Sequence, residues 1–331
     1  MSVLICGGAG YIGSHCIRTF AEYGEDLVVL DNLETGHREA VPPDVKFYEA
    51  DVRDGQALDR IFSENQIEAV IHFCAYSLVG ESVQKPLKYF ENNVAGMISL
   101  LQKMRQNGVN RMVFSSSAAV YGDPNHVPIL ETDATIPTNP YGESKRIMEK
   151  MIDWVSKICP LRYVSLRYFN VAGASLNGDI GEDHRPETHL IPLILQVPLG
   201  KREKVVIFGD RYPTKDGTCI RDYIHVEDIS RAHWNALDYL RHAGESMVCN
   251  LGSGVGYSVK EMISAARNVT QFDIPVEVSE NRPGDPAKLV ADIQKARETL
   301  SWEPRITSIE EIIASAWKWH QSHPNGYTQN H

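Results

Sequence analysis

The stretch Val3-Leu-Ile-Cys-Gly-Gly-Ala-Gly-Tyr-Ile-Gly13 opens the chain and decides its fold. Its first four residues form a short apolar run, which is typical of a buried strand. Gly7, Gly10 and Gly13 follow, and glycines at this spacing allow a tight turn and a close approach of the backbone to a pyrophosphate. The pattern over residues 14–23 predicts a helix, whose N-terminus would offer free amides and a positive dipole end to an anion.

A second apolar run, residues 27–30, ends at Asp31. An acid at about this distance from Gly13 is placed to bind the ribose hydroxyls of an adenosine. Because a carboxylate would repel a 2′-phosphate, the pattern favours NAD over NADP. The alternative is a glycine-rich turn that only packs a helix against a strand. The strand on either side and the acid make dinucleotide binding the better interpretation.

Further strands are predicted at residues 46–51, 70–73 and 111–114, with helical stretches between them, notably over residues 86–107. Strands that alternate with helices imply an α/β fold with a Rossmann-type, doubly wound parallel sheet and right-handed crossovers. Ligands of such sheets bind beyond the carboxyl ends of the strands. We therefore expect one crevice to be surrounded by Gly10, Asp31, Asp51, Phe73 and Ser117.

Composition excludes several classes of function. The chain has 331 residues, 43% hydrophobic and 23% charged residues, and a net charge of −10, which argues against nucleic acid and anionic membranes as partners. No apolar run approaches the roughly 20 residues of a transmembrane helix, and no signal peptide is recognised at the N-terminus. The cysteines are scattered, which is typical of free thiols in a reducing, cytoplasmic setting. His184 and His189 lack a typical metal-site spacing, so no metal is expected.

The segment Tyr141-Gly-Glu-Ser-Lys145 follows Pro140 and reads as the start of a helix. The spacing puts the tyrosine and the lysine on one helical face. A tyrosine hydroxyl has a pKa near 10, but an ammonium at about 4 Å could stabilise the phenolate by roughly 4 kcal/mol. The pair is therefore a candidate general base for an alcohol, with Ser117 as a hydroxyl donor beside it. By itself the spacing would favour a packing tyrosine next to a solvated lysine, and the dinucleotide turn reverses that preference.

The glycine turn, the strand-end serine and the Tyr-x-x-x-Lys pair, in this order, resemble the extended branch of the short-chain dehydrogenase/reductase superfamily. Within it, longer strings are similar to the family of UDP-glucose 4-epimerases over nearly the whole chain. These strings are Phe114-Ser-Ser-Ser-Ala-Ala-Val-Tyr-Gly122, Pro140-Tyr-Gly-Glu-Ser-Lys145, Leu166-Arg-Tyr-Phe-Asn170, Thr218-Cys-Ile-Arg-Asp-Tyr-Ile-His-Val226 and Asn250-Leu-Gly-Ser-Gly254. The resemblance implies reversible epimerisation of UDP-glucose and UDP-galactose at carbon 4, through a 4-keto intermediate, with one tightly bound NAD, in galactose metabolism.

The resemblance also implies roles for the residues already named. Tyr141 would take the proton from the sugar 4-hydroxyl, and Ser117 would donate a hydrogen bond to the same oxygen. Lys145 would bind the nicotinamide ribose and lower the pKa of Tyr141. The cofactor site implied is Gly7, Gly10, Tyr11, Ile12, Gly13, Asp31, Asn32, Asp51, Val52, Phe73, Ala75, Asn92, Tyr141, Lys145 and Tyr168.

For the nucleotide sugar, the resemblance implies a binding site formed largely by residues of the C-terminal part of the chain. Arg221 and Arg282 would bind the diphosphate, because a planar guanidinium suits phosphate oxygens. Asp285 would accept from the ribose, and Phe208 would contact the uracil. The full set implied for the substrate is Ser117, Asn170, His189, Phe208, Arg221, Tyr223, Arg282, Asp285 and Leu289.

Three positions depart from the family pattern. Ser77 stands where better-known bacterial members have a lysine, and His189 stands where they have a substrate-contacting asparagine. Leu289 occupies the gatekeeper position, which is a tyrosine in members restricted to glucose and a small residue in members that accept N-acetylated sugars. Activity on the N-acetylated pair is therefore left open.

Other functions remain as alternatives. A 4,6-dehydratase would need an acid pair where this chain has Ala118 and Ala119. A UDP-glucuronate 4-epimerase would want extra groups for the sugar carboxylate. A protein that only senses NAD would be expected to lose the tyrosine or the lysine of the catalytic pair.

The resemblance further suggests how the chain is organised. We expect an NAD-binding domain over residues 1–170 and a substrate lobe over residues 171–331, with a chain that crosses between them more than once. We also expect a homodimer formed through helices near residues 89–107 and 145–158.

Overall fold

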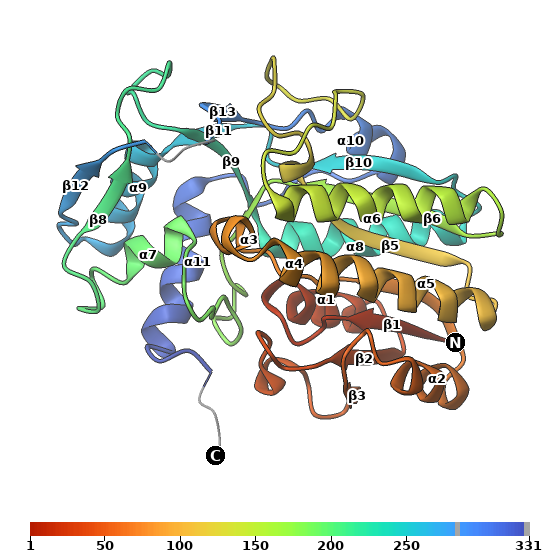
Figure 1. Cartoon of the computed structure of the whole chain (residues 1–331). Helices are drawn as coiled ribbons and strands as arrows, with labels where there is room; N and C mark the ends of the chain where they lie inside the picture. The colour runs from red at the N-terminus through yellow and green to blue at the C-terminus, as the bar shows by residue number, and fades with distance from the viewer. Residues whose placement is uncertain (282–284, 328–331) are drawn as a thin grey trace.

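A seven-stranded parallel sheet forms the centre of the larger lobe (Figure 1). The structure is a computed structural model, and it describes residues 1–281 and 285–327. The strand order is β10-β6-β5-β4-β1-β2-β3. The strands are β1 (Ser2–Cys6), β2 (Leu27–Asp31), β3 (Lys46–Glu49), β4 (Ile67–His72), β5 (Arg111–Ser117), β6 (Arg162–Tyr168) and β10 (Met247–Leu251). The predicted Rossmann-type α/β fold is confirmed.

Helices cover both faces of this sheet, and the side chains of β1 show why. Val3 and Ile5 belong to one apolar cluster, whereas Leu4 and Cys6 belong to the other. The first cluster packs under α1 (Tyr11–Glu22) and α8 (Val226–Arg241). The second packs under α2 (Gly55–Glu64), α5 (Gly96–Gln106) and α6 (Pro140–Ser156). All five residues of β1 are buried, as expected for a central strand of a parallel sheet.

The glycine turn places α1 directly beyond the carboxyl end of β1. Gly7 has φ of +81°, a conformation that a residue with a side chain rarely adopts. A Cβ atom on Gly13 would lie 2.2 Å from the carbonyl oxygen of Gly7. The helix therefore starts at Tyr11, three residues before the predicted residue 14, because the glycine turn packs directly against the first turn of α1.

Other predicted elements differ in detail: the strand predicted at residues 46–51 ends at Glu49, and the strand predicted at 70–73 spans Ile67–His72. The helix predicted over residues 86–107 is divided into α4 (Pro86–Tyr89), the π-helical segment Phe90–Ala95 and α5. The wide turn buries Asn92 and Asn93. The strand predicted at residues 111–114 runs on through Ser117, because β5 pairs with β6 along its whole length.

The second lobe is built on short strands and three helices. One sheet joins β7 (Asn170–Ala172), β9 (Ile220–His225), β11 (Gly256–Ser258) and β13 (Lys288–Leu289), and another pairs β8 (Val205–Phe208) with β12 (Val276–Ser279). The helices are α7 (Leu190–Leu195), α9 (Val259–Thr270) and α11 (Ile309–Ser322), which share one apolar core. Further segments are α3 (Val79–Gln84), α10 (Gln294–Leu300) and the 3-10 turns Arg38–Ala40 and Ala118–Val120.

The chain returns to the first lobe after entering the second. β10 and α8 lie beyond residue 170 in the sequence, yet β10 pairs with β6 and α8 packs on α1. The first lobe thus contains sequence from both sides of residue 170, and the boundary at that residue stays a prediction. In the part of the chain that the structure describes, none of the helices combines the length and apolar character that crossing a membrane requires.

Candidate active site

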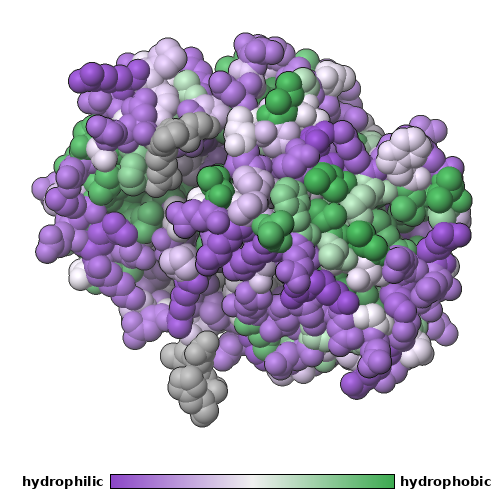
Figure 2. Space-filling model, in the orientation of Figure 1, coloured by the Kyte–Doolittle hydropathy of each residue, from purple (hydrophilic) through white to green (hydrophobic). Residues whose placement is uncertain are grey.

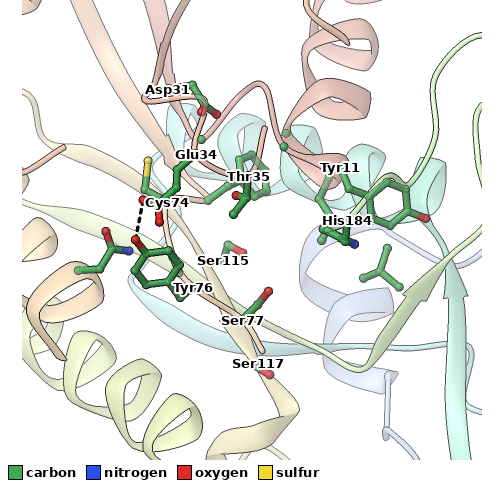
Figure 3. Close-up of a pocket in the computed structure, with 18 of the residues that line it drawn as sticks. Tyr11, Asp31, Glu34, Thr35, Cys74, Tyr76, Ser77, Ser115, Ser117 and His184 are labelled. Carbon is green, nitrogen blue, oxygen red and sulfur yellow. Dashed lines mark hydrogen bonds between the residues drawn. The ribbon is translucent and has the colours of Figure 1, made fainter. Parts of the chain in front are cut away.

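A cavity of about 310 Å³ lies at the carboxyl ends of the central strands (Figure 3). Its walls come from the glycine turn, the ends of β2, β4, β5 and β6, and the start of α6. Every residue that the sequence predicted for the cofactor lines it: Gly7, Gly10, Tyr11, Ile12, Gly13, Asp31, Asn32, Asp51, Val52, Phe73, Ala75, Asn92, Tyr141, Lys145 and Tyr168.

The glycine-turn end of this cavity fits a dinucleotide. Gly10 caps α1 without a side-chain hydrogen bond, which leaves backbone amides of the first helical turn for an anion. Asp31 is buried at the end of β2, and its carboxylate accepts from the amides of Ala9 and Leu33, both at 2.9 Å. Burial raises the pKa of Asp31, while these two hydrogen bonds oppose the shift. The fixed carboxylate keeps acceptor capacity for ribose hydroxyls.

The start of α6 brings Tyr141 next to Ser117. Asn139 caps the helix by accepting from the amide of Gly142 at 2.9 Å. A Cβ atom on Gly142 would lie 2.4 Å from the carbonyl oxygen of Ala119, so a glycine lets the helix approach the turn after β5. Tyr141 and Ser117 then both line the cavity, and Ser117 is close enough to the phenol to affect its pKa.

Lys145 lies one helical turn further along and is buried. Its ammonium donates to the carbonyl oxygen of Ser115 at 2.7 Å. Burial lowers the pKa of Lys145 to about 7. Burial also raises the pKa of Tyr141, and its interaction with Ser117 opposes that shift. The expected lowering of the Tyr141 pKa by Lys145 is therefore not found in this structure, in which the ammonium is directed to Ser115.

A chain of hydrogen bonds fixes α6 to the loop that follows β4. The amide group of Asn93 donates to the hydroxyl of Ser144 at 2.9 Å, and Ser144 donates to the carbonyl of Tyr141 at 2.7 Å. The same Asn93 accepts from the backbone amide of Tyr76 at 2.9 Å. The helix that carries Tyr141 and one wall of the cavity thus move as one unit.

These features have counterparts in known proteins. Residues 3–252 match the NAD dependent epimerase/dehydratase family. The chain belongs to this family.

Individual relatives are similar over the whole chain. The UDP-glucose 4-epimerase of Halalkalibacterium halodurans is 55% identical, with 99% of this chain and 98% of the relative covered. A crystal structure of a UDP-glucose 4-epimerase superposes with a TM-score of 0.97 at 55% identity, covering 99% of this chain and all of the other. The UDP-glucose 4-epimerase of Bifidobacterium longum, in complex with NAD⁺ and UDP, gives a TM-score of 0.93 at 38% identity, covering 99% and 100%.

The residues predicted for the substrate divide into two groups. Ser117, Asn170 and His189 line the cavity. Outside its lining lie Phe208, Arg221, Tyr223, Asp285 and Leu289, and Arg282 falls outside the described residues.

Within the second group, Arg221 and Asp285 form one unit. A terminal nitrogen of Arg221 donates to the carbonyls of Ile220 and Pro286 at 2.9 and 2.8 Å, and the other lies 3.5 Å from Asp285. The guanidinium is thus held at the edge of β9. Leu289, on the neighbouring β13, packs against a cluster that includes Phe169, which itself lines the cavity.

The sequence interpretation missed a group of carboxylates and imidazoles in the substrate lobe. It consists of Glu182, His184, Glu187 and His189, whose candidate ligand atoms all lie within 4.8 Å of one another. Nδ1 of His189 is 2.8 Å from Glu182 and 3.1 Å from Glu187, and Nδ1 of His184 is 3.1 Å from Glu182. The regular spacing of acids and histidines in residues 182–189 was visible in the sequence, but their pairing across a loop was not.

The charges in this group stabilise one another. Burial lowers the pKa of His189, but Glu182 and Glu187 outweigh it and raise the pKa to about 10. Burial raises the pKa of Glu182, but His189 and His184 hold it well below its usual range. Groups of this kind can bind metals. In this structure the same contacts form a network of ion pairs between His189 and the two carboxylates.

Several further lining residues were not predicted as site residues. Most follow directly after strands whose ends were already assigned to the crevice, so their positions gave a usable signal. They are Glu34, Thr35, Ala50, Cys74, Tyr76, Ser77, Ser115, Phe169, Val171, Glu182 and His184.

The ion-pair network predicts a pH-dependent effect of His189→Asn. A raised pKa means that the stabilisation is fully present below pH 6.5 and is lost as the pH rises through about 10. Because the His189 side chain is 41% exposed, solvent screens the pair, and we expect a loss of about 1 kcal/mol in unfolding free energy near pH 6. Urea unfolding near pH 6 and near pH 9.5 measures the difference, which should shrink at the higher pH.

His126→Asn is the matched control, because His126 pairs with Asp133 at 3.1 Å on the surface, away from the cavity. We expect a change of less than about 0.5 kcal/mol at both pH values. A His189→Asn penalty that grew between pH 6 and pH 9.5 would contradict the assignment of a protonated His189.

Proposed function

We propose that this protein interconverts UDP-glucose and UDP-galactose by reversible epimerisation at carbon 4, with an NAD that is reduced and reoxidised in each cycle. One observation carries the proposal: Tyr141, Ser117 and Lys145 lie in the same cavity as the glycine turn and Asp31. Support comes from the Halalkalibacterium halodurans UDP-glucose 4-epimerase, which is 55% identical over essentially the full length.

The cofactor is NAD, in agreement with the family and with the NAD⁺ in the Bifidobacterium longum complex. The amides of the glycine turn would hold its pyrophosphate, Asp31 the adenosine ribose and Lys145 the nicotinamide ribose. When bound, NAD supplies the acceptor that takes the hydride from carbon 4 and returns it to the opposite face.

Residues of the chain would carry out the proton transfer. Tyr141 would accept it from the 4-hydroxyl as general base and give it back after the sugar has turned. The Ser117 hydroxyl, which lines the same cavity as Tyr141, would donate to the sugar oxygen and fix its distance from the phenol. Because burial raises the Tyr141 pKa, the phenolate needs a positive charge close by. The ammonium of Lys145, one helical turn further along and in the same cavity, is the candidate.

The substrate lobe would hold the nucleotide and leave the hexose free to rotate. Arg221 and Arg282 would bind the diphosphate, Asp285 the ribose, Phe208 the uracil side, and Asn170 and Tyr223 would complete the contacts. Firm binding of the nucleotide with a loosely held sugar suits a reaction in which the ring must turn.

We also propose that two copies of the chain pair. Apolar side chains gather over α4, α5 and α6 (Figure 2). Leu87, Ile98, Trp154 and Ile158 are exposed by 78%, 44%, 66% and 77%. A contiguous exposed apolar surface of this kind marks an interaction site. The six free cysteines support a cytoplasmic setting, and the proposed substrates would suit a role in galactose metabolism.

Turnover should require no added oxidant. Purified protein should carry NAD and interconvert UDP-glucose and UDP-galactose in both directions, because each reduced cofactor is reoxidised in place. Chromatographic separation of the two nucleotide sugars, together with the NAD content of denatured enzyme, measures this. A demand for stoichiometric external NAD would indicate a net dehydrogenase and would contradict the proposal.

Removal of the Tyr141 hydroxyl tests its role as general base. Tyr141→Phe should lower turnover by about 10²- to 10⁴-fold, because the phenol that accepts the proton is removed. The NAD content should stay at the wild-type level. Tyr239→Phe is the control, since Tyr239 lies outside the cavity lining and accepts from the amide of Glu245. Near-normal turnover of Tyr141→Phe would sink the assigned role.

A charge in the exposed apolar surface tests the proposed pairing of two chains. Trp154→Lys should convert the dimer to a monomer, because it places a charge in the apolar surface over α6. Sedimentation velocity at micromolar concentration measures the mass. Phe272→Lys is the control, because Phe272 is 47% exposed but lies in the other lobe, just after α9. A wild-type monomer, or a Trp154→Lys dimer of unchanged stability, would rule out this interface.

A further inference from the structure

Two side chains that line the cofactor cavity bond to each other and have no part in the chemistry described above. Tyr76 lies in the loop after β4, and Glu34 lies in the loop after β2 (Figure 3). The phenol of Tyr76 donates to the carboxylate of Glu34 at 2.5 Å, and both residues line the cavity. We call this bond the clasp.

The topology of the sheet places the clasp over the glycine turn. β1 lies between β4 and β2, and the glycine turn begins where β1 ends. A bond between the loops that follow β4 and β2 therefore spans the end of the strand between them. The loop after β4 also touches the turn, since a Cβ atom on Gly7 would lie 2.8 Å from the amide nitrogen of Cys74. The clasp thus closes a ring around the position expected for the pyrophosphate.

The Tyr76 half of the clasp is firmly anchored. Buried Asn93 accepts from the amide of Tyr76 at 2.9 Å and donates to its carbonyl at 3.2 Å. The ammonium of Lys88 lies 4.1 Å from the centre of the Tyr76 ring, close enough for a cation–π contact. Burial raises the pKa of Tyr76, and Glu34 raises it further, so the phenol remains a donor at neutral pH.

The Glu34 half is held more weakly. Glu34 is exposed, and its backbone amide donates to the side chain of Asn32 at 3.2 Å. Asn32 in turn donates to Asp51 at 3.2 Å. If the bond between the Tyr76 phenol and the Glu34 carboxylate breaks, only the surface loop that carries Glu34 becomes free to move. A bond with one fixed end and one movable end can open and close without disturbing the sheet.

We propose that the Glu34–Tyr76 clasp retains the cofactor, because the bond must open before NAD can leave the cavity. This inference rests on the proposed function, since retention matters to an enzyme that reoxidises its own NAD. Glu34 and Tyr76 then determine how long NAD stays bound, whereas the glycine turn and Asp31 determine how it is recognised.

The test measures release of NAD from the holoenzyme. Protein loaded with radiolabelled NAD is mixed with a large excess of unlabelled NAD, and the retained label is followed by filtration. Tyr76→Phe and Glu34→Gln should each speed the release about three- to tenfold, because each removes or weakens the same bond. The double variant should be no faster than the faster single variant, since the two side chains act through one contact.

Tyr48→Phe is a matched control. Tyr48 donates to Glu64 at 2.6 Å, a bond of the same kind that lies outside the cavity lining. Its rate of label release should equal that of the wild type. Unchanged release from both clasp variants, or effects of the two substitutions that multiply in the double variant, would overturn the proposal.

The outcome also separates this inference from the proposed function. Wild-type protein that turns over without added NAD, but whose clasp variants release label at the wild-type rate, supports the epimerase function and refutes the clasp. Wild-type protein that retains NAD but leaves UDP-glucose unchanged refutes the function, while faster release from the variants still supports the clasp. Wild-type protein that loses its label during mixing refutes retention directly.

Discussion

The contact between Gly13 and the carbonyl oxygen of Gly7 is the constraint on which the rest of the structure depends. A side chain on Gly13 would come within 2.2 Å of that oxygen, so α1 can start against the end of β1 only because a glycine stands there. This approach fixes the direction of the helix and points its first amides into the cavity. It also sets the position of Tyr11, whose hydroxyl donates to Gly173 in the second lobe at 2.7 Å. One steric requirement thus links the cofactor turn to the substrate lobe.

Burial and charge act differently at the two ends of the cavity. At the catalytic end, burial raises the pKa of Tyr141 and lowers that of Lys145, which disfavours charge on both groups. At the substrate end, Glu182 and Glu187 overcome burial and keep His189 charged. His189 is thus held as one member of an ion-pair network with Glu182 and Glu187. Tyr141 and Lys145 are both shifted towards their neutral forms, as expected for buried groups.

Much of the fold and most of the cofactor side of the site could be predicted from the sequence. Strand ends such as Asp31 and Ser117 converge in any doubly wound parallel sheet, so their places in the sequence locate the crevice. The substrate side was less accessible. Arg221 and Asp285 are distant in the chain and meet because β9 pairs with β13. The pairing of His189 with Glu182 depends on a loop whose path no local pattern specifies.

By itself, the sequence determined the glycine turn, the order of strands and helices, and the Tyr141–Lys145 spacing, because these depend on local sterics and periodicity. Only the tertiary structure decided which charges meet and where the ammonium of Lys145 points, because burial and pairing are properties of the packed chain. The bond between Glu34 and Tyr76 is of this second kind. Neither residue belongs to a recognisable motif. They meet because the loops that follow β4 and β2 flank the carboxyl end of β1, which lies between these strands.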